Sequence, residues 1–68
     1  MSSIGTELPK EQERVRKLRD LYLELEGGAG KIGAVLMELS LKKAEQAVAS
    51  GDVIKILQAY EDLKGYKE

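Results

Sequence analysis

Two glycine-containing interruptions divide this 68-residue chain into three segments, and each segment has the apolar spacing of a helix. One interruption covers residues 27–30 and the other centres on Gly51. Glycine commonly ends a helix, and no stretch alternates with the period of two that marks a strand. Short connections make neighbouring helices antiparallel. The predicted fold class is therefore all-α, a three-helix up-down-up arrangement with two long helices and a shorter C-terminal one.

The first helix is expected to begin near Pro9, because proline suits the first turn of a helix, and to stop at Glu26 before the glycines. This start divides the chain into a flexible N-terminal segment, residues 1–8, and a single helical domain, residues 9–68. An apolar stripe with seven-residue spacing marks its buried side. Its members are Leu8, Val15, Leu18, Tyr22 and Leu25.

The second helix is predicted from Lys31 to Ser50, and its apolar residues cover well over half of its circumference. One side carries Ile32, Val35, Leu36 and Leu39, and an adjacent side carries Met37, Leu41, Ala44 and Val48. A helix that is apolar over so wide an arc needs cover on more than one side. Two helices of the same chain or a second chain could supply it. Because so small a domain buries little surface, we expect a homo-oligomeric helical bundle.

The third helix is predicted from Val53 to Lys64. Gly51 can take the left-handed conformation that ends the preceding helix, and Asp52 can cap the next one. Val53, Ile56, Leu57, Tyr60 and Leu63 follow helical spacing. Gly65 ends this helix.

The residue types that are missing exclude most catalytic chemistry. The chain has no cysteine and no histidine, so thiol nucleophiles, imidazole bases and tetrahedral zinc sites are ruled out. We expect no enzyme, no catalytic or metal-binding residues and no cofactor. No apolar run approaches the length that spans a bilayer, and the first residues do not resemble a signal peptide. No membrane partner is therefore expected, and the expected location is the cytoplasm.

The charges are nearly balanced, with 11 basic and 12 acidic residues, whereas nucleic-acid binders usually carry a basic surplus. The densest basic segment holds Arg14, Arg16, Lys17 and Arg19, which point in several directions around a helix. Interleaved acids favour pairs along the helix, such as Glu13 with Lys17. Binding of DNA or RNA is therefore the least favoured hypothesis.

The loop before the second helix is the one candidate ligand site. Its glycines would let backbone N–H groups approach a phosphate at a helix N-terminus, beside Lys31. The P-loop pattern is absent, because Leu25 and Ile32 stand where it needs glycine and serine or threonine. A generic anion-binding loop and a simple turn between helices both remain open.

An antiparallel third helix would return its C-terminus toward this loop. The predicted ligand-binding residues are therefore Gly28, Gly30, Lys31, Lys64 and Tyr66. Backbone N–H groups and lysines would hold phosphates, and the ring of Tyr66 would stack on a base. Basic residues that complement the dipole of the third helix are the structural alternative for Lys64.

From about Val15 to Glu68, the chain resembles small accessory proteins of tailed phages and prophages. The resemblance lies in the glycine loop, the apolar helix after it, the sequence Ala-Ser-Gly-Asp-Val at 49–53 and the sequence Ala-Tyr-Glu-Asp-Leu-Lys-Gly at 59–65. Such proteins include inhibitors of host defence, some binding host proteins and others sequestering nucleotide immune signals as helical oligomers. The resemblance implies these classes and the cytoplasm of a host cell.

Three functions follow as hypotheses. The first is a non-enzymatic homo-oligomer that sequesters a small phosphate-bearing ligand, such as a defence signalling nucleotide. The alternative is a protein-binding inhibitor or adaptor that docks a host or phage protein through an apolar face of the second helix. The third is a nucleic-acid-associated regulator that uses the basic segment of the first helix.

Overall fold

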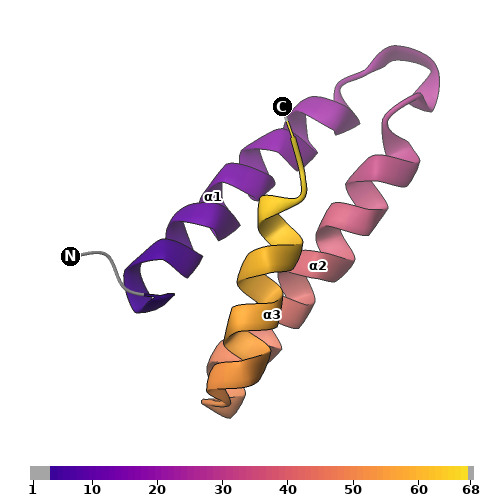
Figure 1. Ribbon diagram of the computed structural model, residues 1–68. Helices are drawn as coiled ribbons and strands as arrows, with labels where there is room; N and C mark the ends of the chain where they lie inside the picture. Colours follow the sequence, from indigo (N-terminus) through magenta and orange to yellow (C-terminus); the bar gives the residue numbers. More distant parts are fainter. Residues whose placement is uncertain (1–3, 68) are drawn as a thin grey trace.

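The computed structural model describes residues 4–67, which form three α-helices that pack against one another (Figure 1). They are α1 (Ile4–Leu23), α2 (Lys31–Ser50) and α3 (Val53–Lys64), with a short 3-10 turn, η1 (Glu26–Gly28), between the first two. The chain runs up, down and up through them, and no strand occurs within residues 4–67. The predicted all-α class and order of helices are confirmed.

The core lies where the three helices meet. Leu8, Val15 and Leu18 of α1 contact residues of α2 and α3 there. The α2 and α3 members are Met37, Leu41, Ala44, Ala47, Ala59 and Leu63. Most of the predicted stripe on α1 is therefore buried, and Tyr22 packs partly buried at its edge. Leu25, the last member of that stripe, is half exposed.

The predicted start of the first helix at Pro9 is wrong, because α1 already begins at Ile4. Proline inside a helix removes one backbone hydrogen bond, here the one to the carbonyl of Gly5. The helix continues because Leu8 lies in register with Val15 and is only 1% exposed. Residues 4–8, which the sequence assigned to a flexible segment, are thus helical, and residues 1–3 of that segment lie outside the described residues.

The predicted end of the first helix at Glu26 is also three residues too late. The helix ends at Leu23, and Leu25 takes an extended conformation with φ −66° and ψ 135°. The carbonyl of Tyr22 accepts a bond from Leu25 N rather than from a residue four positions on. Residues 24–30 therefore form the connection to α2.

The predicted bounds of the second and third helices are confirmed. Gly51 has φ 70°, and its N–H bonds back to the carbonyls of Ala47 and Val48, as in a left-handed helix end. The carboxylate of Asp52 accepts bonds from Ile54 N and Lys55 N at 2.9 and 3.3 Å. This cap satisfies two N–H groups that the first turn of α3 leaves without a partner.

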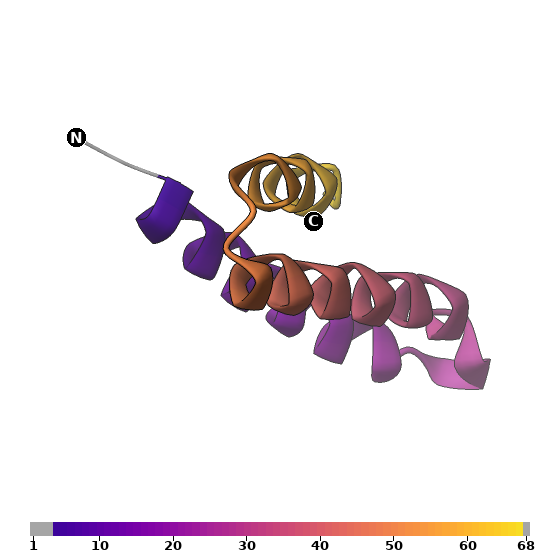
Figure 2. The same cartoon turned by 90° about the horizontal axis from the view of Figure 1, so that it is seen from below.

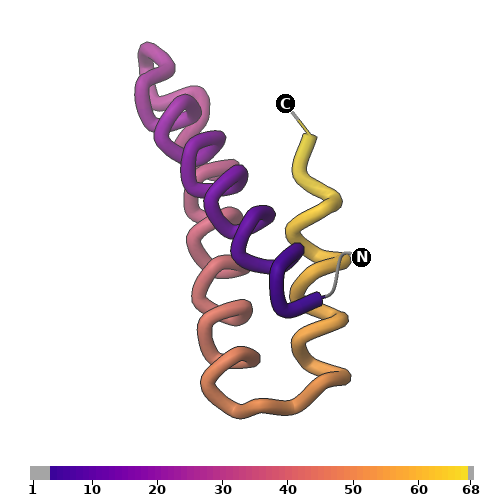
Figure 3. Tube along the Cα trace, turned by 90° about the vertical axis from the view of Figure 1, so that its left-hand side faces the viewer, coloured from indigo at the N-terminus to yellow at the C-terminus, as the bar shows by residue number. Residues whose placement is uncertain are grey.

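The third helix covers only part of the hairpin that α1 and α2 form. It has 12 residues against 20 in each of the others, and it lies on one side of that hairpin (Figure 2). It stays close to α2 near residue 51 and diverges toward its C-terminus (Figure 3). The end of the hairpin near residues 24–30 is therefore left open. Over residues 4–67, none of the helices combines the length and apolarity that a bilayer crossing requires.

Candidate functional site

The glycine loop is shaped by its contacts with Tyr22. A Cβ at Gly30 would lie 2.1 Å from the carbonyl oxygen of Tyr22, and one at Gly33 would lie 2.7 Å from the ring. Gly30 therefore lets the start of α2 approach the backbone at the end of α1, and a side chain at Gly33 would require the Tyr22 ring to shift. Gly27 and Gly28 have φ of 70° and 71°, a conformation that disfavours side chains. The turn thus accounts for these four glycines without a ligand.

The predicted loop residues for ligand binding lie together. The Lys31 side chain runs beside Gly28, since a Cβ on that glycine would be 3.6 Å from Lys31 Cδ. Lys31 is exposed, whereas Gly30 is buried against Tyr22. Only Gly28 and Lys31 of this group are therefore open to an incoming anion.

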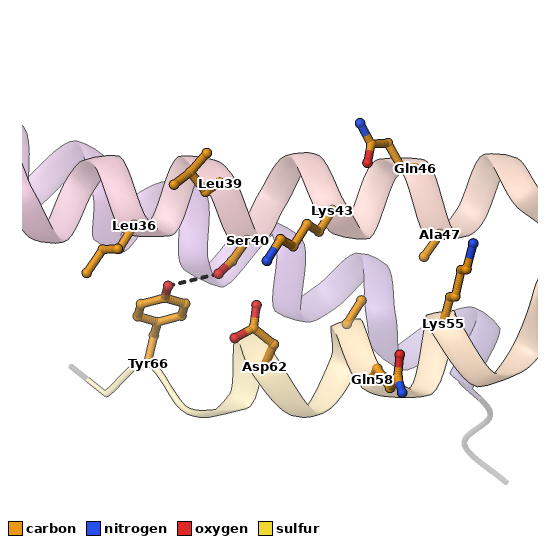
Figure 4. Close-up of a pocket in the computed structure, with 11 residues that line it drawn as sticks. Leu36, Leu39, Ser40, Lys43, Gln46, Ala47, Lys55, Gln58, Asp62 and Tyr66 are labelled. Carbon is orange, nitrogen blue, oxygen red and sulfur yellow. Dashed lines mark hydrogen bonds between the residues drawn. The ribbon is translucent and has the colours of Figure 1, made fainter.

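The predicted C-terminal residues do not reach the loop. The hydroxyl of Tyr66 lies 2.8 Å from Ser40 Oγ, in the middle of α2 (Figure 4). Ser40 is nine residues beyond Lys31, about 13 Å along the helix at 1.5 Å per residue. The ammonium of Lys64 lies 5.1 Å from the centre of the Tyr60 ring, a cation–π contact. The 12 residues of α3 are too few to return these side chains to the start of α2.

The basic segment of α1 is occupied by ion pairs. Lys17 pairs with Glu13 at 3.5 Å, as predicted, and Arg14 pairs with Glu11 at 3.2 Å. Arg14 also donates to the carbonyl of Leu63 at 2.9 Å, which ties α1 to α3.

The other two arginines of this segment connect α1 to α2. Arg16 lies 3.9 Å from Glu45, and Arg19 bonds both Asp20 and Glu38. The hydrogen bond to Asp20, with a further bond to Glu38, raises the pKa of Arg19 above its ordinary value. These guanidinium groups are committed to intramolecular partners rather than to phosphates.

The outer face of α2 carries four exposed large apolar side chains. We call Ile32, Val35, Leu36 and Leu39 the α2 ridge. Their exposed fractions are 79%, 57%, 50% and 52%, although their spacing is that of a helix face that packs. The adjacent apolar side of the same helix is covered at Met37, Leu41 and Ala44. The prediction that α2 needs cover on two sides is thus met within the chain on one side only.

Two grooves flank the α2 ridge. The larger, about 680 Å³, lies between α2 and α3 and is lined by Leu36, Leu39, Lys43, Lys55 and Tyr66 among others (Figure 4). The smaller, about 240 Å³, lies between the end of α1 and α2. Its lining includes Leu23, Val35 and Leu39. Leu39 borders both grooves, so the α2 ridge separates two hollows into which side chains of another helix could pack.

A smaller apolar group lies at the start of α3. Val53, Ile54 and Leu57 are 61%, 68% and 47% exposed. Val53 and Leu57 belong to the predicted apolar spacing of this helix, yet its core contacts are made by Ala59 and Leu63, with Ile56 and Tyr60 partly buried. Neither of the two grooves beside the α2 ridge is lined by Val53, Ile54 or Leu57.

Sequence reasoning did not find the contact between Ser40 and Tyr66 or the place of Leu23 beside the α2 ridge. Ser40 is 7% exposed and was hidden within an apolar run of α2. Its partner lies 26 residues away, so no local spacing signals the bond. Leu23 lines the smaller groove because α1 ends there, and that end was predicted three residues later.

No family model, curated protein or solved structure matches this chain. The resemblance to phage accessory proteins therefore stays a prediction.

Proposed function

We propose that this chain is a non-enzymatic protein-binding module and that the α2 ridge is its binding face. The single observation that carries the proposal is the ridge itself, four large apolar side chains at helical spacing, each at least half exposed. Contiguous apolar surface of this kind is typical of interaction sites in soluble proteins. The grooves on both sides of the ridge give a partner helix places to insert its own side chains.

The energetics favour a covered ridge. Burial of one fully exposed valine, leucine or isoleucine side chain is favourable by about 1.5–3 kcal/mol. Burial of each half-exposed ridge side chain by a partner would therefore contribute on the order of 1 kcal/mol to the free energy of association. Among the described residues, 11 large apolar side chains are exposed, and only Leu8, Val15, Leu18, Met37, Leu41 and Leu63 of comparable size are buried. The isolated fold thus leaves the greater part of its large apolar side chains available to a partner.

Sequestration of a phosphate-bearing ligand, the first hypothesis from the sequence, has weaker support. The loop residues Gly28 and Lys31 lie about 13 Å along α2 from the level of Tyr66. Lys64 is engaged by Tyr60. A complete site would need groups from another chain. Nucleic-acid regulation has less support still, because the basic residues of α1 are paired with carboxylates.

A site-specific photocross-linker tests the proposal. Benzoylphenylalanine replaces Leu39 on the ridge or, as a matched control, Leu21 of α1, which lines neither groove. These two leucines are 52% and 59% exposed, so the free chain presents them almost equally. Irradiation of cells that express each variant should give a discrete cross-linked protein band from position 39 and little from position 21. Equal yields, or no product at position 39, would contradict a binding role for the ridge.

A further inference from the structure

The α2 ridge has opposite charges at its two ends. Lys42 and Lys43 follow it on α2, one turn beyond Leu39. Glu24 and Glu26 precede it in the connection from α1. All four are exposed, and none takes part in an ion pair within residues 4–67. By contrast, the basic residues between Arg14 and Arg19 each have a carboxylate partner. Lys31, which directly precedes Ile32, is likewise exposed and without an ion pair among the described residues, so two carboxylates and one ammonium precede the ridge and two ammonium groups follow it.

A two-fold axis would bring these opposite charges together. If a second α2 lies antiparallel on the first, with the axis between Val35 and Leu36, Ile32 faces the partner's Leu39. The same axis sets Lys43 about 11 Å along the helix from the axis, whereas the partner's α2 begins at Lys31, about 7 Å from the axis at 1.5 Å per residue. Lys43 therefore lies past the start of the partner's α2, on the side of its connection from α1. Both lysines then lie beside the partner's acidic connection. Because the axis is two-fold, the same contact between lysines and glutamates occurs at each end of the interface, so both ends bring opposite charges together.

We propose that the occupant of the α2 ridge is a second copy of this chain, packed with the two α2 helices antiparallel. The inference rests on the proposed function, since it names the partner of the same face. Ile32, Val35, Leu36 and Leu39 form the apolar centre, and their counterparts pack toward the two grooves. Lys42 and Lys43 pair with the partner's Glu24 and Glu26 at the rim. Such rim pairs set orientation and specificity more than affinity.

The charge pattern also selects the antiparallel arrangement over the parallel one. In a parallel pair, Lys42 and Lys43 would face their own copies, and Glu24 and Glu26 would face theirs. Like charges placed opposite each other disfavour association. The antiparallel pair replaces both repulsions with attractions and keeps the apolar centre unchanged.

Charge reversal tests this arrangement on the full chain. The variants are K42E/K43E, E24K/E26K and the combined variant E24K/E26K/K42E/K43E, each measured by sedimentation equilibrium and native mass spectrometry at low salt. The unmodified chain should be a dimer. Each double variant should raise the dimer Kd at least tenfold, and the combined variant should return it to within about threefold of the original, because the rim pairs are restored with opposite sign.

The matched control is K10E/K17E, which changes the net charge as much as K42E/K43E does. Its lysine side chains are 73% and 76% exposed on α1, outside the ridge and its grooves. It should leave the dimer Kd nearly unchanged. Circular dichroism of every variant verifies that the helices are retained.

Two results would overturn the self-association proposal. One is a chain that stays monomeric while position 39 cross-links a different protein, which would leave the proposed function intact and replace its partner. The other is a dimer whose Kd responds equally to K10E/K17E and K42E/K43E, or is not recovered in the combined variant. Absence of any cross-link at position 39 would instead remove the proposed function itself.

Discussion

Gly30 lies so close to Tyr22 that a Cβ at the glycine would be 2.1 Å from the tyrosine carbonyl oxygen. This contact joins the end of α1 to the start of α2, and it involves backbone on both sides. The obstacle is therefore not a flexible side chain that could move away. The position of α2, and with it the orientation of the ridge, depends on residue 30 being a glycine, which has no Cβ.

Replacement of this glycine should therefore destabilise the fold. We expect Gly30→Ala to lower the free energy of unfolding by about 2–3 kcal/mol, as overpacking against a fixed neighbour does. Gly28→Ala is the control, because its Cβ would meet nothing closer than Lys31 Cδ at 3.6 Å and only its φ of 71° is unfavourable. That variant should lose about 1 kcal/mol. Urea denaturation measures both, and an equal loss would contradict the packing role of Gly30.

The cap of α3 gives a second prediction. Asp52→Ala removes the carboxylate that accepts from Ile54 N and Lys55 N, and the loss of such a cap costs about 1 kcal/mol. Asp52→Asn, which keeps an acceptor oxygen, should retain most of the stability. The control is Glu61→Ala on the exposed side of α3, which should change stability little. Thermal unfolding followed by circular dichroism distinguishes them, and the prediction fails if Asp52→Ala behaves like Glu61→Ala.

The hydrogen bond between Ser40 and Tyr66 attaches the segment after α3 to the middle of α2. Tyr66→Phe leaves the nearly buried hydroxyl of Ser40 without this partner, so we expect a loss of about 1 kcal/mol. In the double variant Ser40→Ala with Tyr66→Phe, no hydroxyl is left unpaired, and part of the loss should be recovered. A double-mutant cycle in urea measures the coupling. Strictly additive losses would mean that the two hydroxyls do not interact.

Local signals were sufficient to predict the second and third helices. Gly51 could be assigned a left-handed conformation and Asp52 a cap, because both depend on neighbouring residues alone. The start of α1 could not be predicted in this way. Pro9 carries a local signal for a first turn, and burial of Leu8 against the other helices overrides it. That contact is tertiary, and helical spacing by itself does not reveal it.

The candidate face was only partly visible in the sequence. The wide apolar arc of α2 predicted the need for cover, and the ridge residues were named as one of its two sides. The helical spacing does not indicate which of the two sides the other helices of the chain bury, because both sides are equally apolar. The three helices bury Leu41 and Ala44 where they meet, and the short α3 leaves Leu39 52% exposed. The predicted convergence of Tyr66 on Lys31 failed for the same reason, since it assumed that α3 runs the full length of α2.

Substitution on the ridge should separate association from folding. The double variant Val35→Gln with Leu39→Gln removes apolar surface without adding a helix-breaking residue. The free energy of unfolding of the dilute chain should therefore change by only about 0.5 kcal/mol. Association through the ridge should be lost in sedimentation velocity. Leu41 is a core residue that is only 3% exposed, so Leu41→Ala, unlike the ridge variant, should lower the free energy of unfolding by about 2–5 kcal/mol. A large loss of stability in the ridge variant would mean that these residues serve the core instead.

Side-chain footprinting with hydroxyl radicals in cells that express the chain measures coverage of the ridge directly. Leu39 and Leu21 are 52% and 59% exposed in the isolated fold, so the free chain should label both to a similar extent. If the ridge is a binding face, Leu39 should be labelled several-fold less than Leu21 in cells, and the difference should vanish in the purified chain diluted until it dissociates. Equal labelling of the two leucines in cells would contradict the proposal that a protein covers the α2 ridge.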